Sequence, residues 1–425
     1  MTDEPKTRGA QAGDPVVQHG RLPRTRPIAA AVKLLAIGLA VVLVAAVSIT
    51  GIAFWSLSSA VKPGVHLTQL NGQTAAPPTV GAISGAVNLL LVGTDTRTGQ
   101  GGEFATRTQL AGSSGVGSND VTILIHIAAN HQSAMVVSFP RDTLVPVPAC
   151  PTANGGFYSA SYGAMLNTTL ARGGLDCPVL TIEKLTGVTI PYAAEISFDG
   201  VASMSNAVGG VTVCVASPIH DRDTGLSLSA GEHSIAGQQA LEFLRTRHGV
   251  GDGSDLGRIS SQEVFLSSLV RKVQSGGELT NPLTLYSLAN AAVHNMQLSD
   301  SLVHVDTLVS MAAALKNIPL QNVVMLQYPT VGDPSNENRV IPYVSADLAV
   351  NAALNSDQPV KLSGTTGRGA ELATGRPATT TPAATPTATP SSGSTAQTPT
   401  AIVLPSTITG QNAAQQTCAK GNAGG

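Results

Sequence analysis

Arginine and aspartate gather in five short stretches of a chain that is otherwise poor in charge. Two of these stretches, LRTR and DLGRI, lie within FLRTRHGVGDGSDLGRI, residues 243–259, which holds Arg245, Arg247, Asp255 and Arg258. The other three are GTDTR with Asp95 and Arg97, SND with Asp120, and SFPRD with Arg141 and Asp142. Charged residues make up only 12% of the chain, against about a quarter in soluble domains. This clustering favours a local site over a general surface charge.

The residue types at these positions indicate binding of a phosphate-rich ligand. Guanidinium groups pair bidentately with phosphate oxygens. Carboxylates beside them balance charge, and together with phosphates they form the ligand set of a hard cation such as Mg²⁺. Each stretch also lies at the end of an expected strand or helix, where open α/β sheets bind ligands.

The spacing leaves alternatives open at two places. Arg141 and Asp142 after a proline are also typical of a turn with a surface ion pair. Arg245 and Arg247 would point to opposite sides of a continuous helix, so both can serve one site only if the helix ends near them. The glycine-rich stretch that follows makes such an end plausible, and Arg258 and Gln262, four residues apart, share one helical face.

Several other kinds of site are missing from the sequence. It contains no phosphate-binding G-x-x-x-x-G-K-[ST] loop, no H-E-x-x-H and no G-x-S-x-G, and its nine histidines are scattered. The formal net charge of −2 gives no reason to expect a nucleic-acid partner.

Hydrophobic periodicity predicts one α/β domain, with a central mixed β-sheet flanked by helices. Buried strands are expected at 87–93, 121–127 and 133–139, followed by further strands at 192–198, 211–215 and 321–328. Helices are expected at 179–187, 237–245 and 259–273, and two more within 281–345. Strands that alternate with helices in this way favour helices on both faces of the sheet.

The ends of the chain differ from this domain in composition. Residues 1–33 form a basic, polar tail that suits the cytoplasm, and residues 34–58 are an uncharged stretch long enough to span a bilayer. The stretch exceeds the apolar region of a cleaved signal peptide, so we expect a retained transmembrane anchor with the rest of the chain outside the cytoplasm. The predicted organisation continues with a linker at 59–84, the domain at 85–345 and a disordered Thr/Pro/Ala-rich tail at 346–425.

An extracytoplasmic location permits disulfides among the four cysteines. Cys150 and Cys177 flank a Gly/Ser/Asn-rich loop and could staple it. Cys214 lies within the apolar stretch VTVCV, which predicts a buried free thiol.

The order of motifs resembles the LytR-CpsA-Psr family over residues 85–345. The resemblance rests on NLLLVGTDTR, SNDVTILIHI, SFPRDTLVPVP, the stretch GGLDCPVLTIEKLTGVTIPY and the run LEFLRTRHGVGDGSDLGRISSQ, with mycobacterium-like members most similar. It implies an apolar pocket for a polyprenyl chain, with a pyrophosphate at its mouth. It also implies transfer of a glycopolymer, here arabinogalactan, from a polyprenyl-pyrophosphate carrier to peptidoglycan with Mg²⁺ or Mn²⁺.

The same resemblance implies roles for individual residues. Asp95 and Asp120 would hold the metal, and Asp255 would activate the acceptor or orient an arginine. The pyrophosphate would be bound by Arg97, Arg141, Arg245, Arg247, Arg258 and Gln262, with Arg245 and Arg258 also catalytic. One departure is Ser118-Asn119-Asp120 where many members have Arg-Ser-Asp, which removes one phosphate contact. A non-catalytic binding protein for lipid-linked precursors and a pyrophosphatase are therefore the competing hypotheses.

Overall fold

The computed structural model describes residues 62–70, 85–97, 117–152, 154–275, 281–373 and 401–422, together with Leu110 and parts of a helix between residues 31 and 51. Two compact units are present, Met1–Ser59 and Ala60–Gly425. Within the described part of the chain, no helix is both long and apolar enough to cross a membrane. Many residues of the expected anchor at 34–58 lie outside the described ones.

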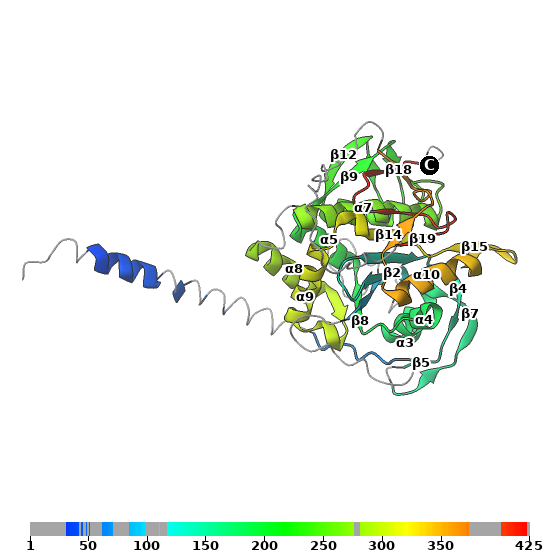
Figure 1. Cartoon of the computed structure of the whole chain (residues 1–425), viewed down its shortest axis with the longest axis horizontal. Coiled ribbons are helices and arrows are strands. Elements are labelled where there is room, and N and C mark those ends of the chain that lie inside the picture. Colours follow the sequence, from blue (N-terminus) through cyan, green and yellow to red (C-terminus); the bar gives the residue numbers. More distant parts are fainter. Residues whose placement is uncertain are drawn as a thin grey trace, which may run out of the picture. The chain divides into compact units, whose positions relative to one another are not determined.

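A seven-stranded sheet forms the centre of the second unit (Figure 1). Its strands follow the order β13-β8-β1-β2-β3-β14-β20. Their bounds are β1 Val87–Thr94, β2 Asn119–Ile127, β3 Ala134–Phe139, β8 Tyr192–Ile196, β13 Met296–Leu298, β14 Val323–Gln327 and β20 Gly410–Asn412. Strands β1 and β8 pair in parallel, as do β3 and β14, whereas the other pairs are antiparallel. The central mixed sheet expected from the sequence is thereby confirmed.

Helices cover both faces of this sheet. Successive side chains of a strand point to opposite sides, and apolar side chains of β1 occur on both sides. Leu90 and Val92 of β1 pack into one core with α4 (Asp176–Thr186) and α10 (Val344–Ser356). Leu89 and Leu91 pack into a second core with α7 (Asp255–Ser275) and α9 (Val305–Lys316).

A second, four-stranded sheet lies on the far side of α7. Its order is β12-β9-β21-β18, with bounds β12 Gly231–Ile235, β9 Val211–Val215, β21 Thr417–Ala419 and β18 Ala370–Leu372. Helix α7 contacts β9 and β21 of this sheet as well as β14 of the central sheet, and Figure 1 shows it running between the two. Both flanks of α7 are therefore held, which fixes the side chains of its first turns.

The remaining elements connect these layers. The helices are α3 Thr169–Gly173, α5 Phe198–Ala207, α6 Gly237–Arg245 and α8 Pro282–Asn295. The short strands are β4 Leu144–Val147, β5 Cys150–Pro151, β6 Phe157–Tyr158, β7 Ser161–Met165, β10 Ile219–His220, β11 Ser227–Leu228, β15 Thr330–Asp333, β16 Asn336–Pro342, β17 Val360–Leu362 and β19 Ile402–Leu404. Single helical turns lie at η2 Leu166–Thr168, η4 Asp300–Leu302 and η5 Leu320–Asn322.

The prediction of a disordered tail at 346–425 is wrong for the described residues 346–373 and 401–422. Helix α10 continues to Ser356, β20 completes the central sheet beside β14, and β21 joins the second sheet. Leu404, Ile408 and Ala413 are fully buried, so this segment does supply apolar surface to the core. The intervening Thr/Pro-rich residues 374–400, which dominated the composition, lie outside the described residues.

The linker expected at 59–84 is also partly folded. Val65 forms a β-bridge with Ser299, and Leu67, 4% exposed, packs into the core that contains α4.

Two disulfides are present among the described cysteines, none of which is free. Cys150 pairs with Cys177, as expected. The free thiol predicted at Cys214 is wrong: this residue pairs with Cys418, and the two Cα atoms lie 4.4 Å apart. The reason is the parallel pairing of β21 with β9, which brings Cys418 opposite Cys214 across 204 residues of sequence.

Candidate functional site

The arginines of the stretch 243–259 stand around a break between two helices. Helix α6 ends at Arg245, and Thr246 leaves the helical conformation with ψ of 133°. Helix α7 begins at Asp255, so Arg258 and Gln262 lie on successive turns of its first half. The break that Arg245 and Arg247 require to serve one site is therefore present.

The end of the central sheet supplies the opposite wall. Asp95 follows β1, Asp120 is the second residue of β2, and Arg141 follows β3 by two residues. Arg141 Nη1 donates to Asp120 Oδ1 at 2.7 Å, while Arg141 Nε lies 3.5 Å from Asp142 Oδ2. The shorter contact of Arg141 is therefore the one with Asp120. The local ion pair with Asp142, which the sequence also allowed, is the longer of the two.

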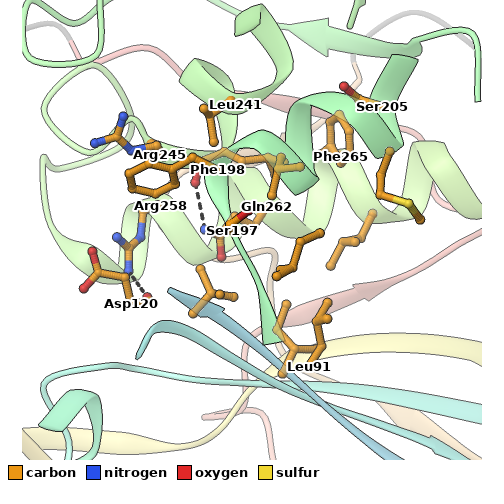
Figure 2. Close-up of a pocket in the computed structure, with 18 of the residues that line it drawn as sticks. Leu91, Asp120, Ser197, Phe198, Ser205, Leu241, Arg245, Arg258, Gln262 and Phe265 are labelled. Carbon is orange, nitrogen blue, oxygen red and sulfur yellow. Dashed lines mark hydrogen bonds between the residues drawn. The ribbon is translucent and has the colours of Figure 1, made fainter. Parts of the chain in front are cut away.

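Arg258, which lies beside Asp120 in Figure 2, joins the two walls together with Asp255. Arg258 Nη2 lies 2.6 Å from Asp255 Oδ1 and donates at 2.7 Å to the backbone carbonyl oxygen of Asp120. Asp255 Oδ1 also lies 3.8 Å from Arg141 Nε. The Arg258 side chain is only 6% exposed, so this is a largely buried ion-pair network.

A cavity of about 470 Å³ opens between these walls. Four arginines line it: Arg141, Arg245, Arg247 and Arg258, with Asp120 and Gln262 beside them. Other polar lining residues are Thr94, Ser197, Ser205, Asp221, Asp223, Thr224 and His248. Most of the remaining wall is apolar, and it includes Leu91, Val121, Ile123, Ile196, Phe198, Val201, Met204, Leu241, Phe265, Leu266, Leu269, Leu288 and Met296. In Figure 2 Arg245, Arg258 and Asp120 gather at one end, while Leu91 and Phe265 lie away from them. The cavity is therefore amphiphilic, with a cationic mouth and an apolar interior.

Two side chains at the mouth are fixed by neighbouring groups. The guanidinium carbon of Arg245 lies 4.2 Å from the centre of the Phe198 ring, a cation–π contact. Gln262 Nε2 donates to the backbone oxygen of Leu244 at 2.8 Å. Gln262 thereby ties α7 to the end of α6 in addition to lining the cavity.

The charges at the mouth are unequally balanced. Burial alone lowers the pKa of Arg141, but Asp120, Asp255 and Asp142 raise it above its ordinary value. The pKa of Arg247 is lowered, first by burial and then by repulsion from Arg141 and Arg258. Among the described residues Arg247 forms no ion pair, whereas Arg141 and Arg258 each pair with an aspartate, so the Arg247 guanidinium keeps donors for an anion.

Asp95 and Arg97 do not line the cavity as described. Asp95 Oδ1 accepts from the Ser118 backbone amide at 2.6 Å and so closes the end of the β1–β2 pair. Residues 98–109 and 111–116 lie outside the described part of the chain.

Asp95 and Asp120 fit a hard divalent cation by their chemistry and position, since they follow Thr94 and Asn119, which are partners in the β1–β2 register. Another cluster, Asp221, Asp223 and His248, also brings possible ligand atoms together. However, Asp221 Oδ1 already accepts from Asp223 N and Oδ2 from Thr246 Oγ1. Asp95 and Asp120 are likewise engaged, with Ser118 N and Arg141 Nη1, so hydrogen bonding does not separate the two sets.

Sequence reasoning missed Asp221, which is 4% exposed and lines the cavity. Its Oδ2 accepts from Thr246 Oγ1 at 2.5 Å, from Arg247 N at 3.1 Å and from Gly249 N at 3.4 Å. Burial alone raises the pKa of this carboxyl, but these hydrogen bonds lower it overall. The turn-forming composition of DRDTG, residues 221–225, is the only sequence signal for such a role.

Asn119 has a structural role within Ser118-Asn119-Asp120, the stretch that replaces Arg-Ser-Asp in this sequence. It is fully buried. Its Oδ1 accepts from Leu170 N at 3.1 Å and from Thr169 Oγ1 at 3.2 Å. Asn119 therefore ties β2 to α3, and only Asp120 of the three residues faces the cavity.

Residues 58–357 match the model of the LytR_cpsA_psr family. One relative, from Corynebacterium glutamicum, is named "Probable cell wall biosynthesis protein LcpB". It is 33% identical to this chain over 59% of this chain and 56% of its own length. The teichoic acid transferase TagT of Bacillus subtilis is 25% identical over 71% of this chain and 87% of its own.

The chain thus spans about half the length of its corynebacterial relatives. A solved structure of protein gbs0355 from Streptococcus agalactiae superposes with a TM-score of 0.52 at 23% identity, covering 64% of this chain and 88% of that one. That likeness supports the mixed α/β fold.

Proposed function

The chain belongs to the LytR-CpsA-Psr family, and from this premise we propose that it is a phosphotransferase of cell wall assembly. It moves a glycopolymer from a polyprenyl-pyrophosphate carrier to peptidoglycan. Relatives carry such activities in their names: TagT of Bacillus subtilis is a polyisoprenyl-teichoic acid–peptidoglycan teichoic acid transferase, and the corynebacterial relatives are cell wall biosynthesis proteins.

The amphiphilic cavity is the observation that carries this proposal. A polyprenyl pyrophosphate is an anion attached to a long apolar chain, and the cavity combines four arginines at its mouth with an apolar interior. The Arg247 guanidinium, which forms no ion pair among the described residues, supports a diphosphate at this point because its donors are free to bind phosphate oxygens.

The reaction follows from this placement. A hydroxyl of peptidoglycan attacks the sugar-linked phosphorus, a new phosphorus–oxygen bond forms, and the bond to the polyprenyl phosphate breaks. Arg245, Arg247 and Arg258 stabilise the charge that develops on the transferring and leaving oxygens, so catalysis is mainly positioning and electrostatics.

Asp255 has two possible roles, and its contacts favour one of them. Its ion pairs with Arg258 and Arg141 suit the orientation of these arginines better than proton transfer from the acceptor. Asp95 and Asp120 would hold Mg²⁺ or Mn²⁺, and the bound metal would supply further positive charge beside the phosphates. Arg97 would add a phosphate contact from the same side.

The cellular setting is also part of the proposal. Residues 34–58 anchor the protein in the cell membrane, with the N-terminus cytoplasmic and the catalytic unit outside. Arabinogalactan is the polymer, which is supported by the corynebacterial relatives and by the mycobacterium-like stretch RTRHGVGDGSDLGRI.

The test incubates the purified chain without its anchor with a lipid-pyrophosphate-linked oligosaccharide and peptidoglycan. Transfer to peptidoglycan is expected, and Arg245→Ala and Arg258→Ala should each abolish it. Release of the oligosaccharide phosphate without transfer would indicate a pyrophosphatase instead, and binding without turnover a carrier-binding protein. Normal transfer by both variants would contradict the site.

A further inference from the structure

We propose that residues Lys420–Asn422, near the C-terminus, position the arginine loop, which we define as residues 246–254 between α6 and α7. The loop carries Arg247, and it separates Arg245 from Arg258. The positioning residues lie outside the stretch that matches the family model, which ends at residue 357. The inference rests on the proposed function, because it concerns the placement of a phosphate-binding arginine.

Three hydrogen bonds join the two segments. Gly251 N donates to Lys420 O at 2.8 Å, and Asn422 N donates to Gly249 O at 2.9 Å. The side-chain amide of Asn422 donates to His248 O at 3.0 Å. Val250 and Gly421 face each other as an antiparallel bridge at the centre of this contact. The C-terminal residues thus act as a short strand along the arginine loop.

The C-terminal segment is itself held firmly, so it can serve as a support. Lys420 N donates to Gly369 O at 2.9 Å, and Gly421 N donates to Ser217 Oγ at 2.9 Å. A side chain at Gly421 would collide with the carbonyl oxygen of Pro218. The preceding strand β21 pairs with β9, and Cys418 is bonded to Cys214.

The arginine loop needs such support because of its composition. It contains Gly249, Gly251 and Gly253, and the last two have positive φ of 58° and 78°. Glycine loses more backbone freedom on ordering than any other residue. Asp221 holds the first half of the loop through Thr246, Arg247 and Gly249. The C-terminal residues hold the opposite edge at His248, Gly249 and Gly251.

The consequence concerns catalysis more than stability. The Arg247 guanidinium forms no ion pair among the described residues, so its position depends on how firmly its backbone is held. A shift of about 1 Å in a positioning group can reduce turnover about 100-fold. Residues Lys420–Asn422 hold the loop that carries this arginine.

The experiment compares Asn422→Ala, Asn422→Asp and a chain that stops after Lys420 with the unaltered protein. Asn422→Asp keeps the size of the side chain but cannot donate to His248 O. The control is Asn322→Ala, which also removes a side-chain amide that donates to a backbone oxygen, that of Gln132 at 2.9 Å. Transfer kinetics, thermal unfolding and amide hydrogen exchange of residues 246–254 are measured for each.

We expect kcat to fall about tenfold in all three variants, with little change in KM and with the melting temperature within about 2 °C of the unaltered protein. Hydrogen exchange of residues 246–254 should become faster, while exchange in the central sheet stays unchanged. Asn322→Ala should leave kcat and exchange in this loop unaltered.

Unchanged kcat and unchanged exchange in the loop would overturn the inference. So would a loss of kcat that merely follows a lower melting temperature. Absence of transfer by the unaltered protein would count against the proposed function instead, and exchange in the arginine loop would still decide whether Lys420–Asn422 hold it.

Discussion

The two walls of the cavity mouth are built in different ways. The sheet-end wall, with Asp120 and Arg141, is fixed by strand register, and its charges neutralise each other at 2.7 Å. The arginine loop, with Arg247, is fixed by hydrogen bonds from Asp221 and Asn422, which are distant in sequence. Arg141 of the first wall has ion-pair partners, whereas Arg247 of the arginine loop has none among the described residues. Under the proposed function, the arginine loop is therefore the wall that would gain more contacts from a bound diphosphate.

Arg258→Ala should have the largest effect, because Arg258 belongs to both walls. Removal leaves Asp255 buried without its nearest cation and the Asp120 carbonyl without its donor. We expect transfer to fall at least about 1,000-fold and the free energy of unfolding to fall by about 3 kcal/mol. Transfer assays and urea unfolding measure both. An unchanged unfolding curve would show that the two walls are not joined through this residue.

Arg247→Ala should separate function from stability. Transfer should fall about 100-fold, yet the free energy of unfolding should stay within about 0.5 kcal/mol of its original value, because Arg247 forms no ion pair among the described residues. The matched control is Arg339→Ala, since Arg339 Nη1 donates to the backbone oxygen of Asn338 and the residue does not line the cavity. A strong loss of stability in Arg247→Ala would contradict the proposed difference between the walls.

Asp221→Asn should loosen the arginine loop without touching the sheet-end wall. Transfer should fall about tenfold, since one carboxylate oxygen now receives three donors. The pKa of Asp221 is lowered in the fold, so its contribution to stability is present above the unfolded value and disappears as pH falls through the folded one. The unfolding free energies of the two proteins should therefore converge in acid, and a constant difference across pH would count against this role.

Glu263→Gln should give the smallest effect on transfer and a clear effect on stability. Burial raises the pKa of Glu263 to about 8, and its Oε1 has no hydrogen-bond partner among the described residues. Because the folded pKa exceeds the unfolded one, stability is full below about pH 4 and falls as pH rises toward 8. Thermal unfolding should show the variant to be more stable at pH 8 and similar to the original at pH 4. Equal melting temperatures at both pH values would refute this.

The sheet-end wall was predictable from sequence, and the support of the arginine loop was not. Buried strands read from VNLLLVG and VTILIHI place Asp95 and Asp120 at neighbouring strand ends, because register follows from a local pattern. The break after Arg245 was visible in the glycines that follow. Asp221 and Asn422 reach the loop only through tertiary contacts over 25 and 174 residues, and no local pattern marks such partners.

The same reason explains the errors at the C-terminus. The composition of residues 374–400 gave the whole stretch 346–425 the character of a disordered tail. The short apolar segments around Leu404 and Ile408 become core because β19 pairs with β17, while β20 and β21 add to sheets whose other strands lie earlier in the chain. The pairing of Cys214 with Cys418 depends on that addition.

A crystal structure of the protein with a bound polyprenyl pyrophosphate tests the central claim most directly. We predict the diphosphate within hydrogen-bonding distance of Arg247 and Arg258, and the polyprenyl chain along Leu91, Val121 and Phe265 inside the cavity. A diphosphate bound elsewhere, or a chain lying outside this cavity, would contradict the assignment of the site.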